Sequence, residues 1–159
     1  MKIEFEPIGV IHTPFKNREG MPIQPVGADG VPGTVEVFQP FTEGLSDLEG
    51  FSHIILLYHF HQSGDAPLRV TPFMDTQPRG VFSTRAPKRP NPIGISVVRL
   101  VKIEGSVLHL ENVDTLDGTP LLDIKPYAPE FDHYPVDRIG WLEKNRKGVR
   151  KKRSDNRFK

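Results

Sequence analysis

The sequence predicts a mainly β protein, an antiparallel barrel or sandwich with one or two short helices. Six short segments are rich in β-branched and aromatic residues and are bounded by glycine or proline, as strands usually are. Two further segments have a helical pattern, and many short strands with few helices favour an antiparallel barrel or sandwich. A chain of 159 residues with 36% hydrophobic and 26% charged residues fits one domain with a packed core.

The strand segments follow one another along most of the chain. In residues 93–104 the side chains alternate, so that one face carries five aliphatic residues and is interrupted by Arg99. The run IILLY within 53–61 is apolar on both faces, which predicts a central strand. We expect strands at 8–13, 34–38, 53–61, 80–84, 93–104 and 106–114, turns at 26–33, 61–67 and 117–118, and helical turns at 41–51 and 136–147.

Composition excludes several classes of protein. The chain has no cysteine, which rules out disulfides, thiolate-bound zinc and a cysteine nucleophile. The first residues, MKIEFEPIGVIHTPF, carry acids where a signal peptide needs an apolar run, and no apolar stretch approaches the ~20 residues that span a bilayer. The glycine-rich fingerprints of dinucleotide and nucleoside-triphosphate sites are absent. We expect a cytoplasmic protein that has no membrane partner.

Charge is divided unevenly along the chain. The net charge is +1, but residues 144–159 hold nine Lys or Arg and one acid, Asp155, which gives +8 and leaves −7 for the rest. We therefore expect a domain over 1–140 and a basic tail over 141–159. Such a tail favours a polyanionic partner, because phosphate binding releases counterions. A solvated, disordered end is the alternative.

The segment RGVFSTRAPKRPNPIGIS (79–96) predicts a stiff, extended, basic loop. Its three prolines each fix φ and remove a backbone donor, which excludes a helix interior. An arginine held in such a loop loses less entropy when it binds a carboxylate or phosphate. We therefore interpret the segment as a functional loop whose arginines, Arg85 among them, can bind an anionic ligand, with Gly94 as a point where a ligand approaches the backbone. A plain strand connection with solvated arginines is the alternative.

Two other groups of polar residues suggest chemistry. His59 and His61 are two residues apart and would share one face of a strand, a spacing that permits a metal pair but is also common for ordinary histidines. Asp114, at a strand end, is a candidate for acid–base or binding work. Asp117, followed by Gly118, fits a plain turn. From these residues alone the function is a small β domain that binds an anionic ligand, with RNA as one candidate.

Four segments, taken together, resemble the TsaA-like or TrmO family. They are FEPIGVIHTPF (5–15), LEGFSHIILLYHFHQ (48–62), GVFSTRAPKRPNPIGIS (80–96) and VDTLDGTPLLDIKPY (113–127), in that order, and the resemblance covers about residues 3–135. It implies a small β-barrel that uses S-adenosyl-L-methionine to methylate N6 of threonylcarbamoyladenosine next to the anticodon of tRNA. The alternatives are the same fold acting on another substrate and a non-catalytic RNA-binding module.

The resemblance also implies site residues and partners. Carried over by matched motif, the cofactor contacts are Gln24, Pro25, His61, Gln62, Arg85, Ile95, Val113, Asp114 and Leu116. No catalytic base or metal site is implied, and members look like homodimers. We expect tRNA phosphates to meet the basic residues of the loop and the tail, namely Lys88, Arg89, Arg150, Lys151, Lys152 and Arg153. Some bacterial relatives carry an additional C-terminal domain, where this chain continues into its basic tail.

Overall fold

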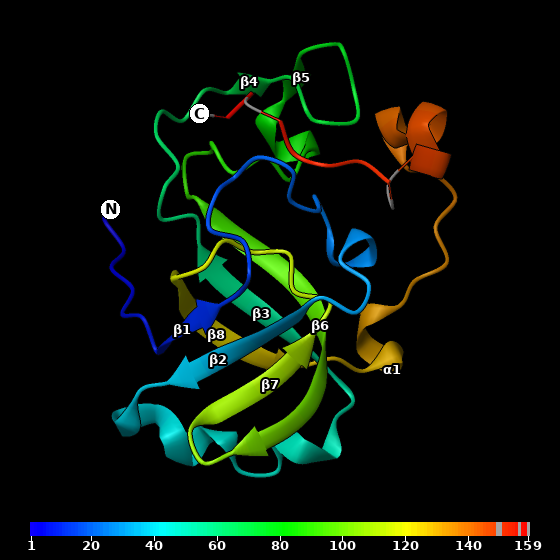
Figure 1. Ribbon diagram of the computed structural model, residues 1–159. Helices are drawn as coiled ribbons and strands as arrows, with labels where there is room; N and C mark the ends of the chain where they lie inside the picture. Colours follow the sequence, from blue (N-terminus) through cyan, green and yellow to red (C-terminus); the bar gives the residue numbers. More distant parts are fainter. Residues whose placement is uncertain (149–150, 156, 159) are drawn as a thin grey trace.

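Six antiparallel strands close into a barrel in the order β1-β2-β7-β6-β3-β8 (Figure 1), which confirms the predicted fold class. The computed structural model describes residues 1–148, 151–155, 157 and 158. The barrel strands are β1 (Gly9–His12), β2 (Pro32–Val37), β3 (His53–His59), β6 (Ile93–Glu104), β7 (Val107–Glu111) and β8 (Thr119–Pro126). The remaining described elements are the two-stranded sheet of β4 (Arg69–Val70) and β5 (Arg79–Gly80), the helix α1 (Pro129–Asp132), and 3-10 helices at Pro25–Gly27, Gln39–Leu45, Leu48–Gly50, Val81–Ser83 and Gly140–Gly148.

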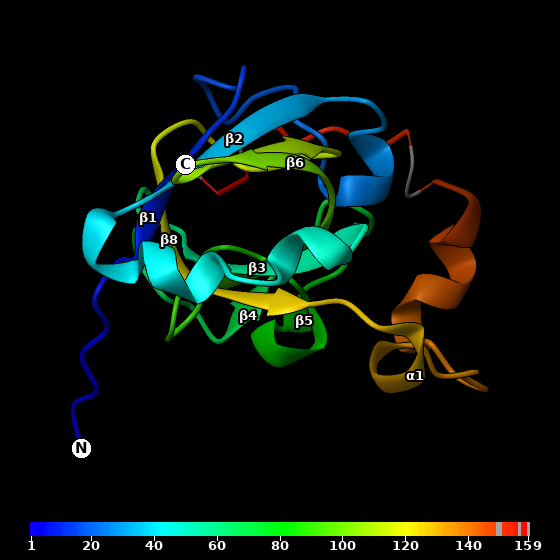
Figure 2. The ribbon, with the colours of Figure 1, turned by 90° about the horizontal axis from the view of Figure 1, so that it is seen from below.

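Alternating side chains fill the barrel. Ile11, Ile54, Leu56 and Leu108 are 0% exposed and come from three different strands. Burial of each such side chain contributes roughly 1.5–3 kcal/mol, so these contacts dominate the stability of the barrel. The 3-10 helices between residues 39 and 50 cross one end of the barrel and insert Leu45 into its core (Figure 2). The long loops therefore lie at the opposite end of the barrel.

Strand β6 faces the other way from what its pattern suggests. Its aliphatic face lies outward, with Ile93 37% and Ile95 43% exposed, while Gly94, Ser96, Val98 and Leu100 point inward. A bulge between Leu100 and Lys102 then reverses the alternation, so that Ile103 packs against the core. The five aliphatic residues on one face of 93–104 thus do not form one buried stripe.

One expected strand differs from the structure, the expected helical turns are present as 3-10 helices, and one strand was not expected. Segment 80–84 is mostly a 3-10 helix rather than a strand, because both the backbone N–H and the hydroxyl of Thr84 bond to the carbonyl of Val81. The helical segments 41–51 and 136–147 form 3-10 turns. Strand β8 was missed, because its prolines and charged residues resemble a turn. It forms because β1 and β3 pair with it on both sides.

The described part of the tail packs on the loop end of the molecule. Arg153 forms an isolated β-bridge with Pro22, and Phe158 is 6% exposed in a small apolar cluster. These tail residues thus have packing partners at the loop end. Within the part of the chain that the structure describes, no helix is long and apolar enough to cross a membrane.

Candidate functional site

Loops distant in sequence gather at the barrel end opposite the 3-10 helices 39–50 (Figure 1). They are the segment after β1, the long connection between β3 and β6, and the β7–β8 loop, with the described tail beside them. Arg85 Nη1 donates to Gln24 Oε1 at 3.1 Å, which joins the first two segments. Ser96 Oγ donates to Asp114 Oδ1 at 2.6 Å, and this bond joins β6 to the β7–β8 loop. Most of the predicted site residues lie on these loops.

A buried chain of hydroxyl groups supports Asp114 from inside the barrel. The hydroxyl groups of Tyr58 and Ser96 are 3.0 Å apart, and the two residues are 5% and 2% exposed. A serine hydroxyl has one proton, and Ser96 donates it to Asp114, so Tyr58 must donate to Ser96. The direction of the chain is thus Tyr58 to Ser96 to Asp114. A carboxylate has about four acceptor positions, so this bond leaves Asp114 able to bind a ligand as well.

Gly94 has a different purpose from the one expected. A Cβ atom at this position would lie 2.2 Å and 2.5 Å from two ring atoms of Tyr58 and 2.9 Å from the ring of Phe60. The absent side chain therefore makes room for the Tyr58 ring, which lies edge-to-face on Phe60 at 5.5 Å. Gly94 therefore gives space to the Tyr58 ring of the buried hydroxyl chain, and not to a ligand that approaches the backbone.

Burial changes the acidity of this chain. It raises the pKa of Asp114 to about 6, and the Ser96 hydrogen bond and the charge of Arg85 act in the opposite direction. Burial, and then the charge of Asp114, raise the pKa of Tyr58, which therefore stays a hydrogen-bond donor. Asp114 thus changes charge close to neutral pH. The positive charge of Arg85 lowers both pKa values.

The loop that carries Arg85 is braced, as its prolines predict. The guanidinium of Arg89 donates to the carbonyls of Thr84 at 3.1 Å and Ala86 at 3.4 Å. Trp141 Nε1 donates to the carbonyl of Ser83 at 2.8 Å. Arg85 itself is exposed, so the loop presents this side chain outward from a fixed backbone.

The two histidines do not form the strand pair that the sequence suggested. Strand β3 ends at His59, and His61 lies in the following turn with its N–H on the carbonyl of His59. Burial lowers the pKa of His61, helped by the charges of His59 and Arg18. The lowered pKa favours the neutral form of His61. No group of three metal-ligating side chains occurs among the described residues.

The remaining predicted cofactor residues are divided between exposed and buried positions. Gln62 is exposed, Pro25 and Leu116 are partly buried, and the side chain of Ile95 lies on the outer barrel face. Val113 is 0% exposed in the barrel core, so a ligand meets its backbone at most. Sequence reasoning missed Tyr58, Ser96 and Arg18. A polar residue at an inward position of an apolar strand was the available signal for Ser96.

The basic residues expected to meet RNA also differ among themselves. Lys151 and Arg153 are exposed, whereas Lys88, Arg89 and Lys152 are partly buried. Arg89 uses one nitrogen on the loop carbonyls. Arg150 lies outside the described residues.

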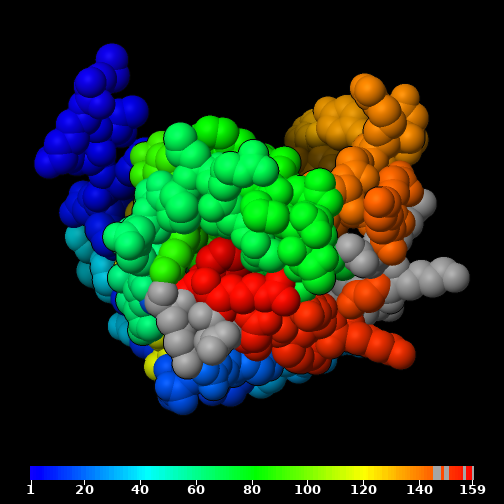
Figure 3. All heavy atoms as spheres, turned by 90° about the horizontal axis from the view of Figure 1, so that it is seen from above, coloured from blue at the N-terminus to red at the C-terminus, as the bar shows by residue number. Residues whose placement is uncertain are grey.

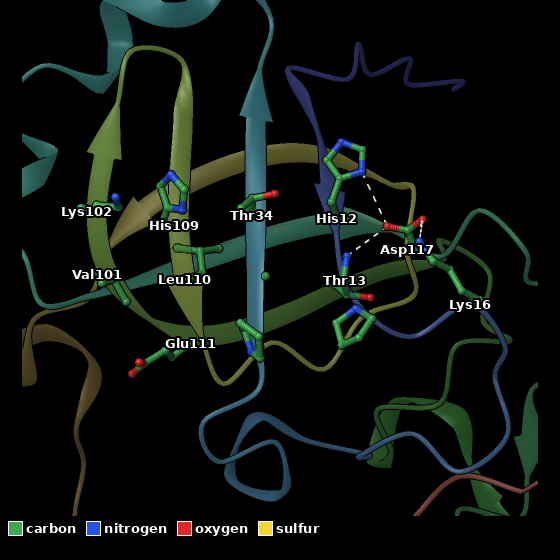
Figure 4. A pocket seen from close by; sticks show the side chains of 13 residues that line it. His12, Thr13, Lys16, Thr34, Val101, Lys102, His109, Leu110, Glu111 and Asp117 are labelled. Atoms are coloured by element: carbon green, nitrogen blue, oxygen red, sulfur yellow. Dashed lines mark hydrogen bonds and ion pairs between the residues drawn. The ribbon is translucent and has the colours of Figure 1, made fainter.

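A groove of about 680 Å³ lies elsewhere, on the outer face of β1, β2, β6 and β7 (Figure 4). His12, Thr34, Lys102 and His109 line it, and Asp117 closes one side by accepting hydrogen bonds from Lys16 and the Thr13 N–H. These bonds hold the pKa of Asp117 below its usual value. Asp117 and Gly118 form the turn before β8, as predicted. None of the nine predicted cofactor residues lines this groove.

Comparison with known proteins agrees with this fold and these loops. The family described as "tRNA-methyltransferase O N-terminal domain" matches residues 10–133. A "Probable S-adenosyl-L-methionine-binding protein" of Pyrococcus abyssi is 58% identical over 158 residues, which are 99% of this chain and 86% of that protein. The human "tRNA (adenine(37)-N6)-methyltransferase" is 37% identical over 134 residues, which are 80% of this chain and 30% of the human protein.

Solved structures extend the comparison to three dimensions. The crystal structure of TrmO from Pseudomonas aeruginosa is 43% identical with a TM-score of 0.75, and the match covers 89% of this chain and 63% of that one. The chain thus spans under a third of the human relative and less than two thirds of the Pseudomonas protein. Its match to the family covers most of its length, and the chain belongs to the tRNA-methyltransferase O family.

Proposed function

We propose that this chain is an S-adenosyl-L-methionine-dependent methyltransferase that acts on N6 of threonylcarbamoyladenosine next to the anticodon of tRNA. Membership of the family and the names of the Pyrococcus and human relatives support the activity, the cofactor and a tRNA substrate. One structural observation carries the proposal. The loop end presents an exposed Arg85 and the partly buried Asp114, each held by its own bracing network.

The residues present fit this cofactor. S-adenosyl-L-methionine has a carboxylate, an ammonium group and ribose hydroxyls. Arg85 is suited to the carboxylate, since a guanidinium binds a carboxylate through charge-assisted hydrogen bonds. Asp114, when ionised, is suited to the ammonium group or the hydroxyls. We propose that these two residues act with Gln24, Pro25, His61, Gln62, Ile95, Leu116 and the backbone of Val113.

The chain's task in such a reaction is positioning. The cofactor supplies an electrophilic methyl group on a positively charged sulfur, so the protein needs no nucleophile of its own. Its residues must hold the two reactants in line and exclude water. Asp114 and the braced loop that carries Arg85 do this at low entropic cost, because Ser96 restricts Asp114 and Arg89 braces the loop backbone.

The same proposal includes the partners. Lys88, Arg89, Arg150, Lys151, Lys152 and Arg153 would bind tRNA phosphates. A homodimer in the cytoplasm completes it, and the exposed Ile93 and Ile95 on the outer face of β6 support an apolar contact between subunits. Light scattering of the purified chain tests the dimer.

Nucleoside mass spectrometry tests the function directly. Purified protein, S-adenosyl-L-methionine and tRNA that carries threonylcarbamoyladenosine should yield that nucleoside one methyl group heavier. Methylation of a different nucleoside would favour another substrate for the same fold. Calorimetric titration with the cofactor separates the last alternative, because a non-catalytic RNA-binding module should show no heat of binding.

A further inference from the structure

The tail is attached to the segment that leads into Gln24. The N–H of Gly20 donates to the carbonyl of Ser154 at 3.0 Å, and the N–H of Ser154 donates to the carbonyl of Met21 at 2.8 Å. The Ser154 hydroxyl accepts from the N–H of Met21 at 3.0 Å and donates to the carbonyl of Arg18. Arg18 Nη1 in turn donates to the carbonyl of Phe158 at 2.6 Å. The segment 18–22 thus pairs with the tail much as a short strand would.

The same tail residues are attached to the connection that carries Arg85. Phe158 packs with Val81 and Ala86, and its ring lies edge-to-face on Phe73 at 5.0 Å. Arg157 Nη1 donates to the carbonyls of Pro72 at 2.6 Å and Asp75 at 3.0 Å. Ala86 directly follows Arg85, so the buried ring of Phe158 sits under the backbone of the cofactor-binding loop.

The tail therefore lies between the two segments that provide Arg85 and Gln24. Figure 3 shows the red tail between the green residues of the β3–β6 connection and the blue residues of the N-terminal third. Directly, Gln24 and Arg85 share a single side-chain hydrogen bond at an exposed position. One such bond contributes little net stability, because water competes for both groups. The contacts made through the tail are both more numerous and better buried.

We propose that residues 153–155, 157 and 158 form a strap that fixes the Arg85 loop against the Gln24 segment, with Arg157 and Phe158 as positioning residues for the cofactor site. The proposal rests on the proposed function for the role of Arg85 and Gln24. The strap also holds the side chain of Arg18, which donates to the carbonyl of Phe158. In this arrangement the tail's largest effect is on cofactor binding, before any contact with RNA.

The strap can be removed without dismantling the barrel. Phe158 belongs to a cluster with Val70, Val81 and Ala86 that shares no residue with the buried cluster inside the barrel. Phe158→Ala should therefore fold, with its effects confined to the loop end. Phe158→Leu keeps an apolar side chain in the cluster and serves as the conservative variant. Lys151→Ala, an exposed tail residue outside the strap, is the matched control.

Hydrogen–deuterium exchange gives the first readout, on the full chain without ligand. The N–H groups of Val81 and Thr84 bond within the Arg85 loop region, and those of Gly20 and Met21 bond to Ser154. In Phe158→Ala all four should exchange faster, while the strands of the barrel exchange as in the wild type. Phe158→Leu should restore most of the protection, and Lys151→Ala should match the wild type. Unchanged exchange at Val81 and Thr84 in Phe158→Ala would overturn the strap.

Calorimetry with S-adenosyl-L-methionine gives the second readout, at a temperature well below unfolding. Phe158→Ala should bind the cofactor about tenfold more weakly, because one or two side chains must then be re-ordered on binding. Wild-type affinity in Phe158→Ala, or an equal loss in Lys151→Ala, would also overturn the positioning role. If the wild type binds no cofactor, the proposed function fails by itself, and the exchange at Val81 and Thr84 still decides whether the strap exists.

Discussion

The protein has two apolar clusters, and they differ in origin and in purpose. The cluster inside the barrel comes from six strands and two 3-10 helices, whose side chains alternate or point inward over short stretches of chain. The cluster at the loop end comes from Val70, Val81, Ala86, Phe158 and Phe73, residues that lie in short strands, loops and the tail. The first cluster determines whether the chain folds. The second determines where the loops of the candidate site lie.

This difference teaches that stability and site geometry are separately encoded here. Asp114 depends on the barrel, since the Tyr58–Ser96 hydroxyl chain that holds it is built on β3 and β6. Arg85 depends on the loop-end cluster and on the brace from Arg89. A substitution in one cluster should therefore change one property and spare the other.

The largest expected effect is on stability, from a cavity in the barrel. Leu56→Ala should lower the free energy of unfolding by about 2–5 kcal/mol, because Leu56 is fully buried and the strands around it cannot collapse. Val81→Ala in the loop-end cluster should lower it much less, yet weaken cofactor binding. Denaturant unfolding and calorimetry on the two variants measure this contrast. Equal losses of stability would show that the clusters form one cooperative unit.

The next largest effect should be on the affinity for the cofactor, with no change in stability. Arg85→Ala should bind S-adenosyl-L-methionine about ten- to a hundredfold more weakly, since hydrogen bonds to charged groups contribute about 1.5–3 kcal/mol. Its unfolding curve should match the wild type, because the side chain is exposed. Arg99→Ala, on the outer face of β6 with Glu111 as its partner, is the control. Wild-type affinity in Arg85→Ala would remove Arg85 from the site.

A pH dependence of cofactor binding should come from Asp114. Its pKa is about 6, so affinity should fall as the pH is lowered through that value and the carboxylate is protonated. In Ser96→Ala the midpoint should move to higher pH, because the Ser96 hydrogen bond favours the ionised form. Calorimetric affinities between pH 5 and 8 test this. Ser46→Ala, at the other end of the barrel, is the control, and an unshifted midpoint in Ser96→Ala would argue against Asp114 as a ligand.

The same carboxyl group should have the opposite pH effect on stability: low pH weakens cofactor binding but stabilises the folded protein. The folded pKa of Asp114 lies above the ordinary value of 3.8, so the folded state holds a proton that the unfolded state releases. The contribution of Asp114 to the free energy of unfolding should therefore fall as the pH rises from 3.8 to about 6. Asp114→Asn should lack this component. Denaturant unfolding of both proteins across this range tests the sign.

The smallest effect should come from exposed charge in the tail. The double variant Lys151→Ala and Lys152→Ala should reduce the slope of tRNA affinity against salt concentration, on logarithmic axes, by about one to two units. Cofactor affinity should stay unchanged, since neither residue belongs to the strap. A filter-binding titration at several salt concentrations measures the slope. An unchanged slope would leave these lysines without a role in RNA binding.

Most of the barrel could be predicted, because strand alternation is a local property of the sequence. β1, β2, β3, β6 and β7 all lie within or beside the expected segments. The inward position of Ile103 on β6 could not be predicted, since it follows a bulge at Val101 that depends on pairing with β7. β8 could not be predicted either, because it too depends on pairing with distant strands. Its prolines and charges are tolerated because β1 and β3 supply pairing on both sides.

The site was less predictable than the barrel, because it is made of contacts between distant residues. The matched motifs predicted Arg85 and Asp114 as cofactor contacts, and the stiffness of the Arg85 loop followed from its prolines. The hydrogen-bond partners of these two residues could not be predicted from the motifs. Ser96 lies 18 residues from Asp114, and Gln24 lies 61 residues from Arg85. The tail showed its charge in the sequence, but nothing local distinguished Phe158 as a buried residue.

Closure of the barrel also constrains how the protein can form during synthesis. β1 begins at Gly9, yet one of its two neighbours is β8, where Gly9 pairs with Leu121. Strand β1 must therefore wait for more than a hundred residues before its second edge is covered, which slows folding and leaves a long partly folded chain. Phe158 follows later still. A released chain that stops before Phe158 would hold a closed barrel with an unfinished site, so competence for the cofactor should require residues that the barrel itself does not need.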